Sequence, residues 1–288
     1  MGKEPKFSIS EVTTYHLSFQ QDLAVYGEAG AGGIGIWEFK LPDGRDPESL
    51  ERLRDSGLQA TLCVPTVVEV IPSGFGGPAD VKERVEAMCA GIRRLAPFNP
   101  VSIACLPGPL GGLELHEARR VAADGLRKAA QTAAEFGIQI AVEPLHPGVL
   151  GDKTIITSVA QTLELIDQID QPNVVILFDV YHHWDQPDIL PRIREHASRF
   201  GGAIHIADWR EPTRTWADRA LPGEGAIDLP ALFGALEASG FDGWYDLEIF
   251  SDDGTFGADY PDSLWKLDPL EMVRRAREGF LRAWQART

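Results

Sequence analysis

Cysteine is scarce in this sequence. Its 288 residues include three cysteines, Cys63, Cys89 and Cys105, and none of them stands in a Cys-x-x-Cys arrangement. An odd number without that spacing argues against a disulfide framework and against a zinc site built from thiolates. We therefore predict three small, buried thiols in a soluble protein of a reducing compartment, which implies a cytoplasmic location.

Long hydrophobic runs and an excess of positive charge are also missing. No run of about eighteen apolar residues is present, and residues 1–6 lack the apolar core of a signal peptide, so we expect no membrane association. Acidic residues number 43 and basic residues 27, which makes the formal net charge −16. A field of that sign repels phosphate backbones, so nucleic acid is not expected as a partner.

What the sequence does contain is typical of an α/β protein. Hydrophobic residues make up 44% and charged residues 24% of the chain, which is enough for a large core. Short apolar runs alternate with longer helical patterns from end to end, as in a parallel sheet covered by helices. The predicted strands are 7–14, 33–39, 59–65, 101–106, 138–144, 174–179, 203–207 and 244–250.

The repeats predict a closed (β/α)₈ barrel, or TIM barrel, in preference to a doubly wound sheet. Such a barrel takes about 250 residues as one domain, and no linker rich in Pro, Gly or Ser divides the chain. We therefore predict that residues 1–288 form a single domain. The glycine-rich residues 71–78 follow the third strand, and we expect them to form a loop over the barrel mouth.

Three helices are predicted most clearly. One lies over residues 115–136 and ends at Gly137. Another begins at Ser158, whose spacing to Gln161 fits a capping box. The last covers about 269–287 and is rich in arginine, which predicts a solvated outer face. The buried face of the first helix should consist of Leu115, Ala118, Ala122, Leu126, Ala129 and Ala133.

The last four predicted strands end at or near a residue that can bind a metal. Active sites of barrels lie at the carboxyl ends of the strands, and consecutive strands are neighbours, so these side chains are expected to converge. A lone acid at a strand end is more often a helix cap or a salt-bridge partner, but four such residues at matching positions favour a site. They are Glu143, Asp179, His205 and Glu248.

Alternation along a strand predicts which of these side chains point into the barrel. In the fifth strand the branched apolar residues take the helix side, which places Glu143 inside. In the seventh strand His205 faces the interior, with Ala203 and Ala207 leaving room around its ring. In the eighth strand Glu248 faces inward.

Asp246 shares the inward side of the eighth strand but lies one layer deeper. We predict that it is a buried hydrogen-bonding residue and not a fifth ligand. Asp179 ends a wholly apolar run, so alternation does not decide which side it faces.

Three carboxylates and one imidazole form a hard, oxygen-rich donor set. Such a set suits Mn²⁺, Mg²⁺ or Co²⁺ better than a structural Zn²⁺. Without a cation the like charges would repel one another and raise their own pKa values. We therefore predict a divalent metal, with Mn²⁺ as the first choice. No glycine motif for a nucleotide cofactor is present.

These residues, with Leu-Pro-Gly-Glu-Gly-Ala-Ile-Asp at 221–228, resemble the xylose-isomerase-like barrel superfamily of sugar isomerases and epimerases. Within it, the ketose 3-epimerase and inosose-metabolism branches are most similar. The resemblance implies that the four residues are the metal ligands and that Glu143 and Glu248 are the catalytic acid and base. It also implies substrate contacts from His182 and from Arg219, and association of the barrel into a homo-oligomer.

The sequence departs from the epimerase pattern at two places. The segment between His205 and Arg219 is longer, so Arg210 or Arg214 could take the role of Arg219. His146 stands near the position of a further glutamate in those enzymes, and we predict that it contacts substrate. Trp37, at the end of the second strand, is expected to form an apolar wall against the substrate. His183 is expected to be a solvent-facing neighbour of His182.

The donor set and the resemblance predict a metal-dependent isomerase or epimerase of a small sugar or cyclitol ketone, acting through a metal-stabilised enediolate. The alternative is a metal-dependent lyase or dehydratase acting on a keto-sugar, a 3-keto-glycoside or a dehydroshikimate-like acid. A non-catalytic carbohydrate-binding barrel is a third hypothesis. An apurinic endonuclease is disfavoured, because it would need more histidine ligands and a basic face for DNA.

Overall fold

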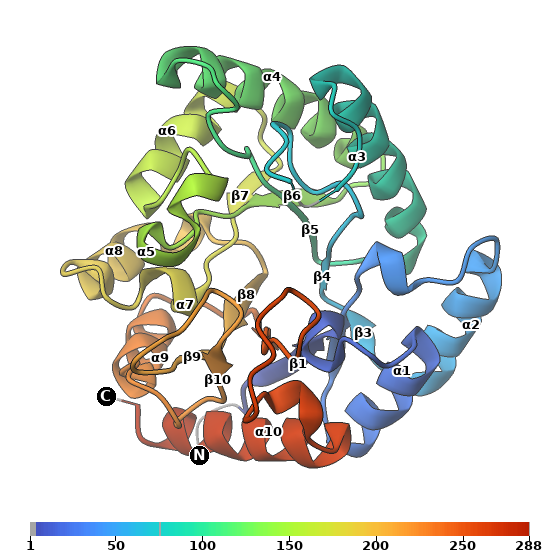
Figure 1. Cartoon of the computed structure of the whole chain (residues 1–288), viewed down its shortest axis with the longest axis vertical. Coiled ribbons are helices and arrows are strands. Elements are labelled where there is room, and N and C mark those ends of the chain that lie inside the picture. Colours follow the sequence, from blue (N-terminus) through green and yellow to red (C-terminus); the bar gives the residue numbers. More distant parts are fainter. Residues whose placement is uncertain (1–3, 75, 288) are drawn as a thin grey trace.

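The computed structural model describes residues 4–74 and 76–287 (Figure 1). Residues 1–3 at the amino terminus and Phe75 of the predicted loop 71–78 lie outside the described residues. In the described chain, strands alternate with helices and form an inner ring of strands inside an outer ring of helices. The prediction of a (β/α)₈ barrel is confirmed.

The barrel strands are parallel and follow the order of the chain. One sheet has the order β3-β2-β1-β11-β8 and the other the order β4-β5-β6-β7. The two sheets meet at two places. At Thr61 one barrel strand is interrupted, and β3 and β4 are its two halves. Between β7 and β8 the ring is closed by parallel bridges, which include the one between Asp179 and His205. The strands are β1 (Lys6–Ser10), β2 (Gly33–Gly35), β3 (Gln59–Ala60), β4 (Leu62–Cys63), β5 (Ser102–Cys105), β6 (Gln139–Val142), β7 (Val174–Ile176), β8 (Ala203–Ile206) and β11 (Trp244–Leu247).

The longer helices cover the outside of the barrel. They are α1 (Phe19–Glu28), α2 (Asp46–Ser56), α3 (Val81–Leu95), α4 (Leu115–Ala134), α6 (Val159–Ile169), α8 (Ile189–His196), α9 (Leu229–Ala238) and α10 (Pro269–Gln285). Two short helices, α5 (Pro147–Leu150) and α7 (Val180–His183), belong to the loops after β6 and β7. No helix of the described chain is long and apolar enough to cross a membrane.

The helix ends agree with the sequence patterns in most details. Gly137 has a left-handed φ of 70° just beyond α4, where only a residue without a Cβ is unstrained. Ser158 accepts a hydrogen bond from the Gln161 backbone, while the Gln161 side chain accepts from Thr157, so the box is shifted by one residue. The predicted face of α4 is buried except for Leu115, which is 49% exposed because it stands in the first turn.

Buried side chains separate into two clusters, as alternation along the strands predicts. The large cluster lies between strands and helices and includes Ile140, Ile204 and Leu247. The small cluster fills the barrel and includes Ala141 and Ala203 together with Leu62, Val64, Ala104, Val175 and Leu177. All three cysteines are buried and free.

One residue of the seventh predicted strand is placed differently from the prediction. Ala207 packs with the outer cluster and not inside the barrel. It follows the end of β8, where the chain leaves the regular pleat, so strict alternation no longer applies.

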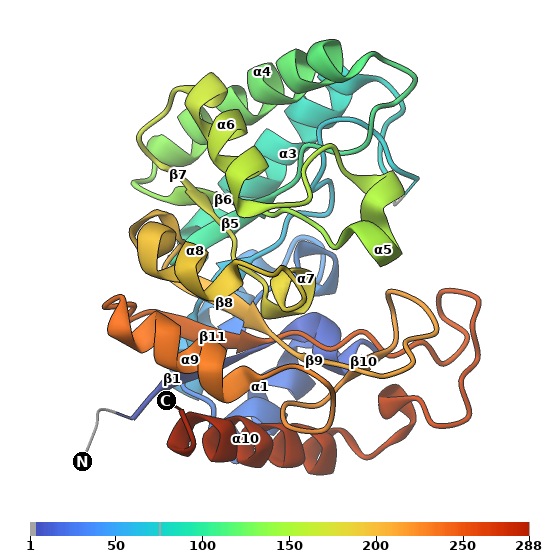
Figure 2. The ribbon, with the colours of Figure 1, turned by 90° about the vertical axis from the view of Figure 1, so that its left-hand side faces the viewer.

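Loops at the carboxyl ends of the strands cover one end of the barrel. Figure 2 shows the hairpin of β9 (Asp208–Trp209) and β10 (Arg219–Ala220), the loop after β11 and α5 at the end away from the amino terminus. The loop at 71–78 reaches the same region, because the Ser73 carbonyl accepts a hydrogen bond of 3.2 Å from Lys153, in the loop after β6. These loops surround the carboxyl end of the barrel interior.

Candidate metal centre and active site

The structure brings Glu143, Asp179, His205 and Glu248 together. One possible ligand atom from each lies within 4.8 Å of the others, and all four residues are buried. Glu143 and Glu248 directly follow β6 and β11, and His205 lies within β8. Asp179 lies three residues beyond β7 and caps α7, where its carboxylate accepts a 2.8 Å hydrogen bond from the Tyr181 backbone. Four successive strands thus deliver these donors to one point.

His205 stands between the two glutamates and a deeper aspartate. Its Nδ1 atom lies 3.3 Å from Glu143 Oε1 and 3.4 Å from Glu248 Oε2. Its Nε2 atom lies 3.6 Å from Asp246 Oδ2. Asp246 in turn accepts a hydrogen bond of 3.2 Å from Thr61, which agrees with the prediction that it is a buried hydrogen-bonding residue.

Arg219 is a charged partner of the same group. Its Nη1 atom lies 3.0 Å from Asp179 Oδ2 and 3.1 Å from Glu248 Oε2. The guanidinium carbon lies 4.2 Å from the centre of the Tyr181 ring, an arrangement that restricts the arginine to this orientation. The Arg219 side chain is 2% exposed, so solvent screens its charge very little.

The pKa values in this group reflect burial among opposite charges. Burial would raise the pKa of Asp179, but Arg219, His182 and His205 outweigh it and lower that pKa to about 2. For the imidazole of His205, burial has the opposite effect and would lower the pKa, but the neighbouring carboxylates, led by Glu248 and Glu143, raise it to about 10. For Glu143, burial is the dominant cause and raises the pKa to about 7.

The donor set fits a divalent cation. Three buried carboxylates converge with one imidazole. Arg219 contacts two of these carboxylates, those of Asp179 and Glu248. Carboxylate and imidazole donors with room for substrate oxygens are typical of sites for divalent metals of intermediate hardness. The residues present could therefore hold such an ion.

His182 and His146 lie beside the metal group and contact each other. His182 Nε2 is 3.6 Å from Asp179 Oδ2, and His182 Nδ1 accepts a hydrogen bond of 3.2 Å from the His146 backbone. The ring of His146 packs against Trp209, and its two nitrogens face the Gly148 backbone and Asp185. Both nitrogens of His146 thus have partners within the protein.

His183 is not the solvent-facing residue that we predicted. It is fully buried, its ring stacks on Phe178 with centroids 5.3 Å apart, and its Nδ1 faces the Gln186 amide at 2.8 Å. The turn of α7 directs it toward the outer core, which the sequence alone does not reveal.

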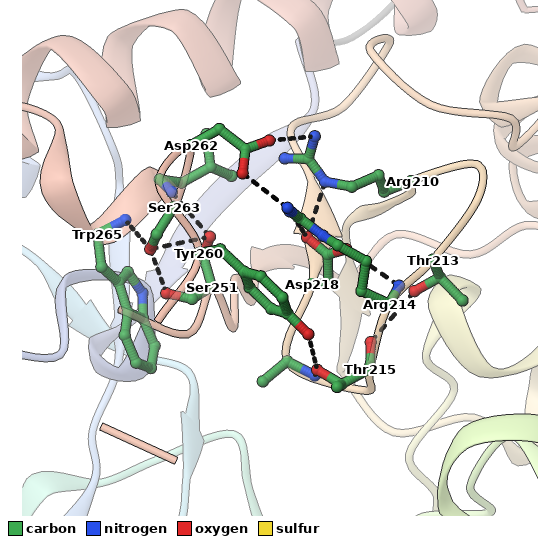
Figure 3. A network of polar contacts seen from close by, with 12 residues as sticks. Arg210, Thr213, Arg214, Thr215, Asp218, Ser251, Tyr260, Asp262, Ser263 and Trp265 are labelled. Carbon is green, nitrogen blue, oxygen red and sulfur yellow. Dashed lines mark hydrogen bonds and ion pairs between the residues drawn. The ribbon is translucent and has the colours of Figure 1, made fainter. Parts of the chain in front are cut away.

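Arg210 and Arg214 lie farther out than Arg219, in a polar network shown in Figure 3. Both guanidinium groups contact the buried carboxylate of Asp218, at 2.8 Å for Arg210 and 2.6 Å for Arg214. Both also contact Asp262 in the loop after β11, at 3.3 Å and 2.8 Å respectively. This network ties the β9–β10 hairpin to that loop, and Arg219 is the arginine that reaches the metal group.

Trp37 forms part of an aromatic wall at the mouth. Its indole nitrogen donates to Ser10 Oγ at 2.8 Å, and its ring contacts Phe39 and Phe250. Phe250 in turn contacts Trp216, Phe256 and Trp265. The wall therefore continues from the barrel interior to the covering loops.

Sequence reasoning missed Tyr181 and Asp218. Tyr181 stacks under Arg219, and Asp218 binds the two outer arginines. Their positions next to His182 and Arg219 in the sequence were the available signals. The partners of both residues, however, come from separate elements, so that pattern alone does not show what they contact.

Fold and site together define a (β/α)₈ barrel with a group of metal-binding side chains at the carboxyl ends of its strands. The chain belongs to the xylose isomerase-like TIM barrel family, whose model matches residues 23–283. This confirms the family predicted from the motifs.

Two curated relatives illustrate the similarity. The 2-oxo-tetronate isomerase of Pectobacterium atrosepticum is 29% identical over 207 residues, which are 70% of this chain and 76% of that protein. The hydroxypyruvate isomerase of Escherichia coli is 27% identical over 238 residues, which are 78% of this chain and 86% of that protein.

Solved structures share the fold over nearly the whole chain. A protein of Sinorhizobium meliloti 1021 has a TM-score of 0.80 and 25% identity, covering 96% of this chain and 98% of its own. The IOLI protein with a binding zinc atom has a TM-score of 0.77 and 20% identity, with 98% and 99% covered.

Proposed function

We propose that this protein is a divalent-metal-dependent isomerase or epimerase of a small sugar or cyclitol ketone. The observation that carries the proposal is the buried convergence of Glu143, Asp179, His205 and Glu248 within 4.8 Å. The family supports it, because the two curated relatives described above are both named isomerases of small oxo acids.

Glu143 and Glu248 are the residues that would move the proton. Both approach His205 Nδ1 from different strands, so two carboxylates face the same small volume. A bound divalent cation would polarise a substrate carbonyl and a neighbouring hydroxyl, which makes the adjacent carbon acidic. One glutamate then removes the proton as a base, and the other returns a proton as an acid. Proton transfer by a positioned group contributes about 10² to 10⁴ in rate.

The other residues would bind and orient the substrate. Arg219 presents its guanidinium at the edge of the metal group, where it can donate to substrate oxygens, and His182 lies beside Asp179. Trp37, in the aromatic wall with Phe39 and Phe250, offers an apolar face. Burial of the whole group excludes water, which strengthens each electrostatic interaction during proton transfer.

Mn²⁺ is the metal that we propose first. Three carboxylate donors favour a hard cation, and the single imidazole extends the choice to Co²⁺ and Mg²⁺. Zn²⁺ is the main competitor, since the structurally similar IOLI protein holds zinc. Metal-free protein loaded in turn with each ion, followed by activity per bound ion, decides between them.

Deuterium exchange tests the proposed reaction directly. The Mn²⁺-loaded protein is incubated in D₂O with ketoses, inososes, 3-keto-glycosides, hydroxypyruvate and a 2-oxo-tetronate. Deuterium in the recovered substrate or its isomer is expected for at least one compound. Metal binding without exchange into any of them would contradict the proposal and favour a carbohydrate-binding barrel.

An unsaturated product in the same experiment would indicate the lyase alternative. Elimination requires an acid that protonates the leaving group. His146, which lies beside the metal group, has both ring nitrogens paired with Gly148 and Asp185. This pairing counts against His146 as the acid that elimination requires.

A further inference from the structure

Asp246 occupies a central position in the barrel interior. It lies on β11, two residues before Glu248, and pairs in register with His205 on β8 and with Ser8 on β1. Its side chain is fully buried. A carboxylate at this depth requires specific partners, because burial of an unpaired charge is costly.

The two carboxylate oxygens of Asp246 have different surroundings. Oδ1 accepts a hydrogen bond of 3.2 Å from Thr61, in the interruption between β3 and β4. Oδ2 lies 3.6 Å from His205 Nε2, and neither of these two atoms has a hydrogen-bond partner elsewhere in the described residues. The carboxylate is thus anchored on one side and directed at the imidazole on the other.

Gly35 makes room for this carboxylate. A Cβ atom at this position in β2 would lie 2.7 Å from Asp246 Oδ2 and 3.1 Å from the Leu62 carbonyl oxygen. Real Cβ atoms almost never make a contact as short as 2.7 Å, so a larger residue would displace the carboxylate from His205. The neighbouring strand is therefore shaped around Asp246.

We propose that Asp246 is a positioning residue that accepts a hydrogen bond from the Nε2–H group of His205 and thereby turns the Nδ1 lone pair toward the metal group. A neutral imidazole carries one proton, and it can ligate through Nδ1 only when that proton is on Nε2. Asp246 Oδ2 is the acceptor next to Nε2, while Nδ1 faces Glu143 and Glu248. The inference rests on the metal site of the proposed function.

Metal affinity without substrate tests this role. In Asp246→Leu the branched shape remains but the acceptor is lost, and we expect Mn²⁺ and Co²⁺ to bind about 10- to 100-fold more weakly. Asp246→Asn can still present an amide oxygen to Nε2, so it should restore part of the lost affinity. The visible absorption of the Co²⁺-loaded protein should differ between wild type and Asp246→Leu, because the orientation of the imidazole ligand changes.

Ser102→Ala is the matched control. Ser102 lies on β5 on the same side as the interior residue Ala104, and its hydroxyl is buried without a hydrogen-bond partner in the described chain. Its removal takes one polar atom from the barrel interior on β5, which β6 and β7 separate from β8 in the ring of strands. We expect unchanged metal affinity and an unchanged Co²⁺ spectrum.

The outcomes separate this inference from the proposed function. If wild type binds no divalent cation, the metal site itself is wrong. If wild type binds and Asp246→Leu binds within twofold of it, Asp246 has no positioning role. Should Asp246→Leu fail to fold, Thr61→Val releases the anchored oxygen instead; a several-fold loss of affinity supports the role, and wild-type affinity overturns it.

Discussion

Binding of a divalent cation to the four-residue group should release protons in a number that depends on pH. The pKa of His205 is raised to about 10, because neighbouring carboxylates outweigh the opposing effect of burial. Burial raises the pKa of Glu143 to about 7. Both groups must lose their protons before they can coordinate a metal, so protons and metal compete.

The size of the effect follows from these two pKa values. At pH 8 the imidazole is almost fully protonated and Glu143 is mostly ionised, so binding should release about one proton. At pH 6 both groups are protonated, and about two protons should be released. Each released proton weakens binding about tenfold for every unit that the pH falls, so affinity should drop by roughly three orders of magnitude from pH 8 to pH 6.

Calorimetry of Mn²⁺ binding in buffers with different ionisation enthalpies counts the released protons. Glu143→Gln is the control, because its amide does not titrate. That variant also removes one of the carboxylates that raise the His205 pKa, so at most about one proton should be released at either pH, and affinity should fall by at most about 10² over the same range. Equal proton release by wild type at pH 6 and pH 8, or none at pH 8, would refute the reasoning.

Three further predictions concern single side chains. Glu248→Gln keeps an oxygen ligand but loses the acid or base, so deuterium incorporation at saturating Mn²⁺ should slow by about 10² to 10⁴; a rate within tenfold of wild type would count against its catalytic role. Arg219→Lys keeps the charge but loses the planar guanidinium that contacts Asp179 and Glu248. The KM for substrate should therefore rise roughly tenfold or more, and an unchanged KM would contradict a substrate contact. Leu126 is fully buried on α4, so Leu126→Ala leaves a cavity and should lower the free energy of unfolding by about 2–5 kcal/mol. Denaturant titration of the metal-free protein measures this, and a loss below about 1 kcal/mol would show that the helix repacks.

Much of the fold was predictable because its signals are local. Each strand and helix pair carries its own alternation or helical period, and the repeats follow one another without interruption. The division of buried residues into an outer and an inner cluster followed from the same alternation. The alternation gave the wrong side for Ala207, because the regular strand β8 ends before that residue.

The site was predictable in its donors but not in all its neighbours. Glu143 and His205 could be directed inward by alternation, and they meet in the structure. The arginine could not be chosen from the sequence, since Arg210, Arg214 and Arg219 all lie in one segment. The fold places Arg219 beside the metal group and over Tyr181, while Asp218 and Asp262 bind the other two.

The sequence by itself determined the order of elements and the residue types at the strand ends, since both depend on patterns within about ten residues of chain. Only the tertiary structure decided which distant groups meet. Asp246 faces His205 and Thr61 across strands that are remote in sequence, and His183 turns into the core with the helix that carries it. Such contacts depend on how the strands close into a ring, and no local period records that closure.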